Sequence, residues 1–262
     1  MDGSKRDSEK VIVSLTSFPG AIDYAAGAVK SILEGTVLPD RIVLYVSMSQ
    51  FEGRELPAPL LELERDNALF EIRSYEPDIR SYRKLIPALE DFPDAVIVTI
   101  DDDVAYHKRM LETLLRYHEL FPDDIIAHRA KRISLGRPYR KWKKYRWYHF
   151  LRKRIHSSSL TMQTGVGGVL YPPGALDEKM LSRELFMKTA PTTDDIWFWA
   201  AAVANGRKVI PVPFGYNKPK SLGKPKELSL KGFNFKSGID RNKENFDAIL
   251  RGYPSIMDKI KL

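Results

Sequence analysis

The sequence contains no cysteine among its 262 residues. Disulfide bonds and thiolate metal sites, including zinc sites held by cysteine sulfur, are therefore excluded. The sequence also lacks any apolar run near the roughly 20 residues that a membrane-spanning helix needs, and its polar start, MDGSKRDSEK, has no signal-peptide core. We therefore expect a protein of the reducing cytoplasm.

Acidic residues are outnumbered, because 34 Asp and Glu face 42 Lys and Arg, giving a formal net charge of +8 and an isoelectric point near 9.4. This balance favours anionic partners such as nucleotides, nucleic acids, phosphates or an acidic membrane face. With 43% hydrophobic residues, the chain is long enough to bury one large core. We expect a polar extension over residues 1–10 and a single domain over residues 11–262.

Apolar strand patterns alternate with helical patterns from residue 11 to about residue 117. The strand patterns are VIVSL, RIVLYVS, FEIRSY and AVIVTI, and the helical ones cover residues 21–33, 57–67, 83–90 and 107–120. Further along, residues 168–171 and KVIPVP predict strands, and residues 194–206 and 244–251 predict helices. Alternation of this kind is typical of an α/β fold in which helices cover both faces of a largely parallel sheet.

Three consecutive aspartates, Asp101, Asp102 and Asp103, follow the strand pattern AVIVTI directly. In open α/β sheets ligands bind at the carboxyl ends of strands, and side-chain alternation predicts Asp101 and Asp103 on one side with Asp102 on the other. Converging carboxylates repel one another, and Mg²⁺ or Mn²⁺ bound by their oxygens relieves that repulsion and indicates a phosphate-bearing substrate. The alternative is an aspartate N-cap of the helix over residues 107–120, for which one aspartate would suffice.

Six segments carry a family resemblance, in the order VIVSLTSFPGAI, SILEGTVLPDRIVLYVS, DIRSYRKLIPAL, VTIDDDVAY, GVGGVLYPPGAL and APTTDDIWFWAAAV. On these segments the chain resembles bacterial glycosyltransferases of the GT-A fold, of the kind that builds capsular or other surface polysaccharides. The resemblance implies a Rossmann-like nucleotide-sugar half over about 11–125, a mixed central sheet, and an acceptor half over about 126–262. The implied reaction is metal-dependent hexosyl transfer from a nucleotide diphosphate donor, preferably a UDP-sugar, to a glycan acceptor.

The resemblance also implies roles for the first loop and the DXD-type triplet. Thr16, Ser17, Phe18 and Pro19 would hold the nucleobase and ribose of the donor. Asp101 would face the ribose and Asp103 the metal, with Asp101 as a second metal ligand. Asp102 could take either role, at the ribose or at the metal, because the triplet can be read in more than one register. The cofactor expected is Mn²⁺ or Mg²⁺.

Basic residues near the strand ends are candidates for gripping the donor. Arg80, Arg83 and Lys84 follow the third strand pattern, although an ordinary solvated helix start explains them as well. Lys224 lies in a basic tail rich in glycine and proline, and such a loop can close over a diphosphate and exclude water. Because no histidine follows His156, a third protein ligand to the metal is left open, with water, phosphate oxygens or Asp240 as the candidates.

A second acidic pair, Asp194 and Asp195, opens the aromatic helix pattern IWFWAAAV. In similar inverting enzymes an acid at this point removes the proton of the acceptor hydroxyl, and partial shielding by aromatic residues raises its pKa. We predict Asp195 as the base, with Asp194 second, against the alternative of a plain helix cap. Gly167, Gly168 and Trp197 are predicted at the acceptor, although the glycine run is nearly as well explained as a turn.

The segment over residues 129–154 is dense in Lys and Arg, with interleaved Tyr and Trp. It fits peripheral contact with an anionic membrane that carries a lipid-linked acceptor, or a merely solvated face. Nucleic acid is not expected as a partner, since no recognition module surrounds the segment. The rival functions are nonetheless a nucleotidyltransferase and a nucleic-acid-binding protein that uses this segment; the location expected is the cytoplasm, free or at the inner face of the plasma membrane.

Overall fold

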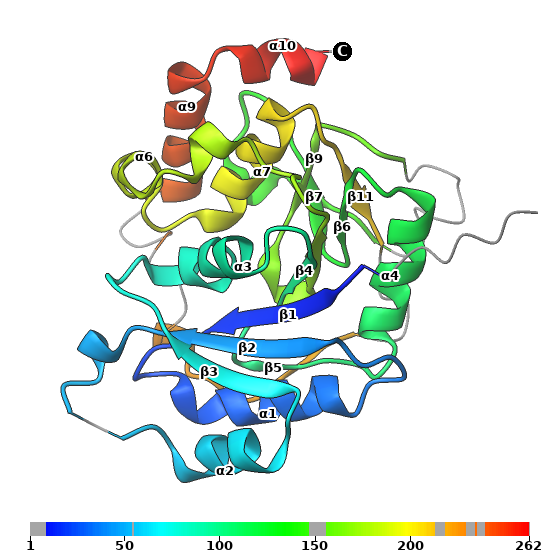
Figure 1. The fold of residues 1–262 in the computed structure, drawn as a ribbon. Helices are drawn as coiled ribbons and strands as arrows, with labels where there is room; N and C mark the ends of the chain where they lie inside the picture. Colours follow the sequence, from blue (N-terminus) through cyan, green and yellow to red (C-terminus); the bar gives the residue numbers. More distant parts are fainter. Residues whose placement is uncertain are drawn as a thin grey trace, which may run out of the picture.

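A seven-stranded sheet forms the centre of the molecule in a computed structural model, which describes residues 9–53, 55–146, 156–212, 218–228, 234 and 239–261 (Figure 1). The strand order is β11-β6-β10-β4-β1-β2-β3. The strands are β1 (Val11–Thr16), β2 (Arg41–Val46), β3 (Phe70–Ser74), β4 (Val96–Thr99), β6 (Ile125–Ala127), β10 (Val169–Tyr171) and β11 (Val209–Pro211). Four of them, β1 to β4, correspond to the four apolar patterns at the start of the sequence.

The sheet is mixed, as predicted. Strands β3, β2, β1 and β4 run parallel, with Ile12 of β1 paired to Arg41 of β2 and to Ile97 of β4. Strand β10 lies antiparallel between β4 and β6, and β11 is parallel to β6. Because β1 and β4 are adjacent and parallel, the loop after Thr16 and the triplet after β4 emerge at the same edge of the sheet.

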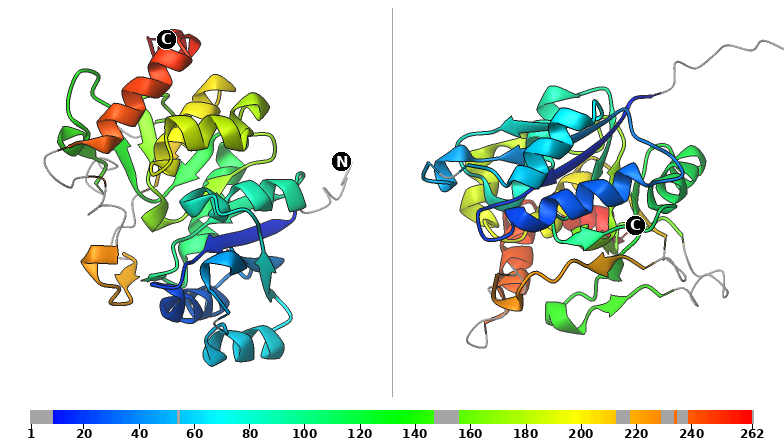
Figure 2. Two further views of the ribbon diagram at one scale, coloured as in Figure 1. Left: turned by 90° about the vertical axis from the view of Figure 1, so that its left-hand side faces the viewer. Right: turned by 90° about the horizontal axis from the view of Figure 1, so that it is seen from below.

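Helices cover both faces of this sheet, with α1 and α2 on one side and α3, α6 and α7 on the other (Figures 1 and 2). Alternate strand residues divide the core accordingly: Ile12 and Ile97 pack with α7, and Val13 and Val98 pack with α1 and α4. The helices are α1 (Ile22–Leu33), α2 (Ala58–Asp66), α3 (Ile86–Asp91), α4 (Met110–Leu120), α6 (Arg183–Thr189), α7 (Asp194–Ala204), α9 (Arg241–Gly252) and α10 (Ser255–Lys261). None of the helices in the described part of the chain has the length and apolarity needed to cross a membrane.

One predicted helix is divided in two. In place of a helix over residues 83–90, the structure has a 3₁₀ turn, η2 (Arg80–Lys84), followed by α3. Pro87 is the physical reason, because proline lacks an N–H and disfavours helical geometry in the residue before it, so it is tolerated only in a first turn. The break leaves η2 as a separate element beside the carboxyl ends of the strands.

A short strap, defined as residues 218–228, crosses the end of the triplet. Its strand β12 (Lys220–Ser221) pairs antiparallel with β5 (Val104–Ala105), and the N–H of Leu222 donates to the carbonyl of Asp103 at 2.8 Å. Side chains of the strap also pack on α1, since a Cβ added at Gly27 would lie 3.1 Å from Leu222. The strap is therefore fixed next to the triplet by both backbone pairing and packing.

Two sequence predictions fall partly outside the described residues. The expected extension over residues 1–10 is described only from residue 9, where the carbonyl of Lys10 already accepts the N–H of Val96 at 2.9 Å. The basic segment over residues 129–154 is described up to residue 146. It contains β7 (Ala130–Arg132) and β8 (Lys143–Lys144), which pair antiparallel, and β7 also pairs with β9 (Thr161–Gln163).

Candidate active site

The triplet lies in a turn rather than in the strand. Strand β4 ends at Thr99, and the N–H of Asp101 donates to the hydroxyl of buried Tyr106 at 2.8 Å. The alternation predicted for Asp101 and Asp103 therefore does not apply, because the extended backbone that would produce it stops before the triplet. The structure instead directs Asp101 to one lysine, and Asp102 with Asp103 to another.

The first group, here called the Lys224 cluster, comprises Ser17, Asp102, Asp103 and Lys224. The ammonium of Lys224 lies 2.8 Å from Asp103 Oδ2 and 3.3 Å from Asp102 Oδ1. Asp102 is buried and accepts a 2.5 Å hydrogen bond from the hydroxyl of Ser17. Burial raises the pKa of Asp102 to about 6, against the opposing effects of Lys224 and Ser17. Phe18 lies beside this cluster, with its ring centroid 5.9 Å from the same ammonium.

The second group, the Lys84 cluster, joins the triplet to the second acidic pair. Lys84 Nζ lies 2.9 Å from Asp194 Oδ2, 3.5 Å from Asp101 Oδ1 and 3.9 Å from Asp195 Oδ1. Burial acts to lower the pKa of Lys84, but the three carboxylates outweigh it and hold the pKa well above its ordinary value. Segments more than 90 residues apart in the sequence therefore meet at one buried ammonium.

The two acids at the start of α7 differ in their surroundings. Asp194 accepts a hydrogen bond from Ser81 at 2.8 Å, and its side chain is only 7% exposed, whereas that of Asp195 is 28% exposed. The N–H of Gly165 donates to both carboxylate oxygens of Asp195 at 3.1 Å, and Gln163 donates to the Asp195 carbonyl at 3.2 Å. Asp195 is thus oriented by its neighbours while one part of its carboxylate stays accessible.

Burial is the main cause of a raised pKa at Asp195, which reaches about 7. The neighbouring Asp194 and Asp101 raise it as well, while Lys84 and the Gly165 N–H act to lower it. A carboxylate with its pKa near neutrality can accept a proton from an alcohol more readily than an ordinary aspartate.

The remaining residues predicted at the donor differ in their burial and in their hydrogen bonds. Thr16 is tied to β2, since its hydroxyl donates to the carbonyl of Tyr45 at 2.8 Å, and Pro19 is half-buried. Arg80 is exposed and has a positive φ of 56°. It is the neighbouring Arg83 that is buried, where it pairs with Asp78 and donates to the Ser17 carbonyl at 3.4 Å.

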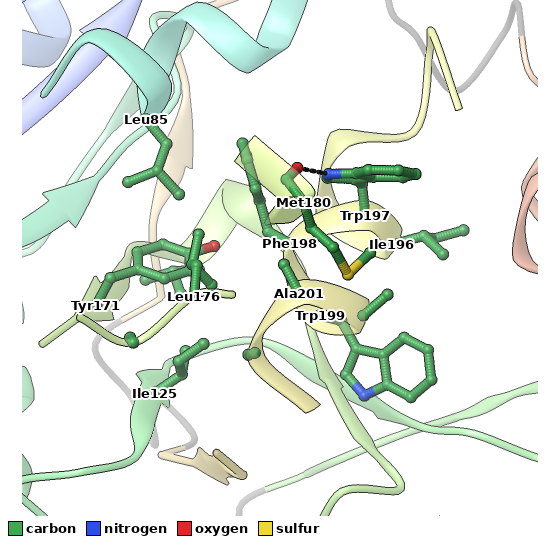
Figure 3. Packing of buried hydrophobic residues seen from close by; sticks show 14 of the residues in the cluster. Leu85, Ile125, Tyr171, Leu176, Met180, Ile196, Trp197, Phe198, Trp199 and Ala201 are labelled. Carbon is green, nitrogen blue, oxygen red and sulfur yellow. Dashed lines mark hydrogen bonds between the residues drawn. The ribbon is translucent and has the colours of Figure 1, made fainter. Parts of the chain in front are cut away.

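The prediction that Trp197 contacts the acceptor is wrong. Its side chain is completely buried, and its indole N–H donates to the carbonyl of Met180 at 2.7 Å (Figure 3). Its ring packs edge-on against Phe186 and Tyr253. The helix α7 is apolar on nearly all sides because it lies inside the core, so its aromatic residues serve packing.

The prediction for Gly168 is also corrected, whereas Gly167 stays a predicted acceptor contact. Both are buried, and a Cβ at Gly168 would lie 3.0 Å from the sulfur of Met110 on α4. Gly168 has a φ of +87°, which favours glycine, so its role is to let the chain turn into β10 against α4. The glycine that borders the site is Gly165, in the 3₁₀ turn η4 (Gly165–Gly167).

Several site residues were missed from the sequence. Ser81, Tyr106 and Gly165 contact the acids directly, yet serine, tyrosine and glycine are too common to single out without a fold. A Cβ at Gly165 would lie 2.6 Å from the Lys84 ammonium, 3.2 Å from Asp101 Oδ1 and 3.3 Å from Asp195 Oδ1, all tighter than ordinary van der Waals contact. The quoted GVGG run was the available signal, but it did not indicate which glycine mattered.

The charges of the site suit a divalent cation. Five carboxylates surround two ammonium groups in the two clusters, which leaves a formal charge of −3 when all are ionised. The Lys224 ammonium forms ion pairs with both Asp102 and Asp103, so these two adjacent carboxylates already share one cation. Within the described ranges no three His, Asp or Glu side chains are placed to enclose a metal ion.

Asp240, a candidate third ligand, is committed elsewhere. Its two oxygens accept the backbone N–H groups of Tyr139, at 3.0 Å, and Lys243, at 3.2 Å, as the N-cap of α9. The prediction of Asp240 as a metal ligand is therefore not supported, because the cap explains the residue. Phosphate oxygens and water remain to complete the shell of a metal bound at the triplet.

Comparison with known proteins identifies the fold. No family model and no curated protein matches the sequence. The structure is similar to the mannosyltransferase PcManGT from Pyrobaculum calidifontis in complex with GDP-Man and Mn²⁺, with a TM-score of 0.53 and 13% identity over 96% of this chain and 74% of that one. It is also similar to residues 1–349 of S. aureus TarS in complex with UDP, with a TM-score of 0.50 and 14% identity over 76% of this chain, which spans 57% of that chain's length. At these identities the likeness concerns the fold, and the chain has the mixed α/β architecture of GT-A glycosyltransferases.

Proposed function

We propose that the protein is a glycosyltransferase that moves a hexosyl group from a nucleotide diphosphate donor to a glycan acceptor with inversion. A UDP-sugar is the preferred donor, and synthesis of a surface polysaccharide such as a capsule is the proposed role. The similar structures support a nucleotide donor, since one is a complex with GDP-Man and Mn²⁺ and the other a complex with UDP.

The observation that carries the proposal is the Lys84 cluster. It brings Asp195, a candidate base with a pKa raised to about 7, next to the triplet at the carboxyl end of β4. Ligands of open α/β sheets bind at this edge. An inverting sugar transferase needs a site that holds the nucleotide diphosphate donor, and a base that can deprotonate the acceptor hydroxyl next to the anomeric carbon. A helix cap alone explains Asp194 or Asp195, but not their shared contact with Lys84, which also contacts Asp101 of the triplet.

The proposed chemistry forms one bond and breaks another. The acceptor hydroxyl oxygen forms a bond to the anomeric carbon while its proton passes to Asp195. The bond from the anomeric carbon to the diphosphate oxygen breaks, and the electron pair leaves with the nucleotide diphosphate. Attack from the face of the sugar opposite the departing diphosphate inverts the configuration at the anomeric carbon.

Asp103 and Asp101 are the proposed ligands of Mn²⁺ or Mg²⁺, with Asp102 beside them. When bound, the metal would stabilise the negative charge that develops on the departing diphosphate. Asp101 and Asp102 would also contact the donor, together with Ser17, Phe18 and the other first-loop residues Thr16 and Pro19. Lys224 would exchange its carboxylate partners for the diphosphate, and exposed Arg80 would approach the same edge.

A panel of nucleotide sugars tests the proposal. We expect Mn²⁺-dependent hydrolysis or transfer with at least one UDP- or GDP-sugar, loss of that activity in chelator, and its loss in Asp103→Asn. Activity that is undiminished in chelator would contradict the metal role. The absence of turnover, and of UDP and GDP binding, across the panel would contradict the assignment as a glycosyltransferase.

We further propose that the basic segment brings the enzyme to an anionic membrane at the cytoplasmic side, where the acceptor is lipid-linked. No Asp or Glu occurs from residue 125 to residue 176, and all the excess positive charge of the chain resides there. Across the β7–β8 ladder Arg132 faces Lys143, and like charges directly opposite one another are unfavourable without a counter-charge. Arg132, Arg140 and Lys143 are exposed, as lipid headgroup contact requires.

A further inference from the structure

The surroundings of Lys84 argue against the donor contact that the sequence predicted for it. Its ammonium is enclosed by three carboxylates, so the immediate charge around that point is negative. A diphosphate approaching Nζ would meet those carboxylates first and be repelled. There is also no room on the side of Gly165, where even a methyl group would lie 2.6 Å from the ammonium.

The 3₁₀ turn that carries Lys84 is attached to both parts of the site. On one side Ser81 donates to Asp194 at 2.8 Å, and the hydroxyl of Tyr82 donates to the carbonyl of Ala190 at 2.8 Å. On the other side Arg83 contacts the first-strand loop through the carbonyl of Ser17. Consecutive residues of η2 thus brace the start of α7 against the nucleotide-binding edge of the sheet.

Tyr82 makes this brace stiff. Its ring is fully buried and stacks on Phe186 of α6 with centroids 4.1 Å apart, and it meets Phe198 of α7 edge-on at 5.3 Å. A side chain packed in this way has one rotamer, and it fixes the backbone from which Lys84 extends. The side chain of Lys84 therefore extends toward the acids from η2, a turn that packing holds in place.

We infer that Lys84 is a positioning residue: its ammonium is the shared counter-ion that holds Asp194 and Asp195 beside Asp101. This inference rests on the proposed function and deepens it, since it assigns the buried cation to the base rather than to the donor. Without the ammonium, three carboxylates would be left close together in a buried site, and repulsion would drive the start of α7 away from the triplet. The accessible carboxylate of Asp195 would then lose its alignment with the donor.

Loss of the Lys84 charge should lower sugar turnover without weakening nucleotide binding. Lys84→Met keeps an unbranched side chain that is one atom shorter and removes the charge, so we expect turnover of the active nucleotide sugar to fall at least about 100-fold, the scale of a misplaced base. The affinities for UDP and GDP in the presence of Mn²⁺ should stay within about threefold of the unmodified protein. Lys30→Met, an exposed lysine on α1, is the matched control and should change neither quantity.

A charge-compensation experiment tests the same claim without any substrate. We expect Asp194→Asn to lower the urea midpoint when Lys84 is present, because it removes a partner at 2.9 Å. In the Lys84→Met background the same substitution should raise the midpoint, because it relieves repulsion among unpaired carboxylates. A structural role of the lysine unrelated to these acids would not produce this reversal of sign.

Gly165→Ala provides a second variant in case Lys84→Met does not fold. It keeps every charge but places a methyl group against the Lys84 ammonium, so turnover should fall while nucleotide affinity is kept. The inference is overturned if Lys84→Met weakens UDP and GDP binding tenfold or more with turnover at saturation unchanged, or if the effect of Asp194→Asn has the same sign in both backgrounds. If the unmodified protein turns over no nucleotide sugar, the proposed function fails, and the sign of the Asp194→Asn effect still decides the role of Lys84.

Discussion

Asp195 combines two properties that a general base needs, orientation and a pKa near the working pH. The Gly165 N–H fixes its carboxylate from one side, and burial raises its pKa to about 7. Asp194, by contrast, is engaged by Ser81 and Lys84. The two adjacent acids therefore differ in their contacts, and the proposed function gives the role of the base to Asp195 alone.

The pH dependence of the reaction follows from Asp195. Because the base must be unprotonated, we expect kcat/KM to fall about tenfold per pH unit below an apparent pKa near 7, as kcat/KM reports the free enzyme. A profile that stays flat down to pH 5 would contradict the role of Asp195. In unfolding experiments this group acts in the opposite direction: the folded protein binds its proton more tightly, so its stabilising contribution is lost as the pH rises from about 4 to about 7.

Trp197 is a residue of the core, and a conservative change should show it. We expect Trp197→Phe to lower the free energy of unfolding by about 2–3 kcal/mol, because it leaves the Met180 carbonyl unpaired and opens a small cavity. Urea unfolding measures this loss, and the KM for the acceptor serves as the comparison. A stable variant with a raised acceptor KM would restore the original prediction of acceptor contact.

At the scale of elements, the strap over residues 218–228 places an ammonium where a metal ion is proposed. Lys224 lies within hydrogen-bonding distance of Asp103, and β12 and β5 hold the strap there. In the proposed function, a metal bound at the triplet would displace that ammonium, which would then be free to contact the diphosphate. Metal binding at the triplet would therefore change the contacts of Lys224 in the strap.

This exchange can be measured with the metal alone. We expect Lys224→Met to bind Mn²⁺ about tenfold more tightly in the absence of nucleotide, a change of about 1.4 kcal/mol, since one competing cation has been removed. Binding of UDP or GDP in the presence of Mn²⁺ should weaken in the same variant. Titration calorimetry measures both, and Mn²⁺ affinity that is unchanged or reduced would show that Lys224 does not compete with the metal.

The elements most easily predicted from the sequence were those with strong periodic patterns. The strands β1 to β4 and the helices α1 and α7 were expected close to their observed bounds, because continuous apolar runs and 3.6-residue spacing leave few alternatives. Short strands such as β6 and β9 have only three residues each and carry no local pattern. Their positions depend on partners far away in the sequence.

The sequence predicts which acidic residues belong to the candidate site, but not which lysine each of them contacts. The triplet and the pair at the start of α7 are recognisable in the sequence because consecutive carboxylates repel one another and are therefore unusual without a partner. Which acid meets which lysine depends on where β4 ends and on the turn η2, and neither can be derived from alternation or propensity. Trp197 was misassigned for a related reason, since an aromatic residue beside an acid suits a core as well as a sugar site.

At the scale of the whole molecule, charge is distributed very unevenly. The site carries a cluster of carboxylates, whereas residues 125–176 carry no acid at all. The net charge of +8 is therefore the sum of +12 over residues 125–176 and −4 over the rest of the chain. Such an arrangement gives the molecule a distinct basic region suited to an anionic surface.

Vesicle binding tests the function of this basic region. Reversing Arg140, Lys141 and Lys143 to glutamate should weaken binding to phosphatidylserine-containing vesicles by about 100-fold or more, at roughly 1 kcal/mol for each charge near the surface. Reversing Lys179, Arg183 and Lys188, which are also exposed, makes the same change in net charge elsewhere and should have a much smaller effect. Equal losses in the two triple variants would contradict a defined membrane-facing segment.

The proposed function requires the triplet and Asp195 to form two functional parts of one site. The decisive measurement is a paired determination of nucleotide affinity, with Mn²⁺ present, and of sugar turnover for Asp103→Asn and Asp195→Asn. We predict that Asp103→Asn loses both, whereas Asp195→Asn keeps the affinity and loses turnover by about 100-fold to 10,000-fold. Full turnover in Asp195→Asn, or unchanged metal-dependent nucleotide binding in Asp103→Asn, would contradict it.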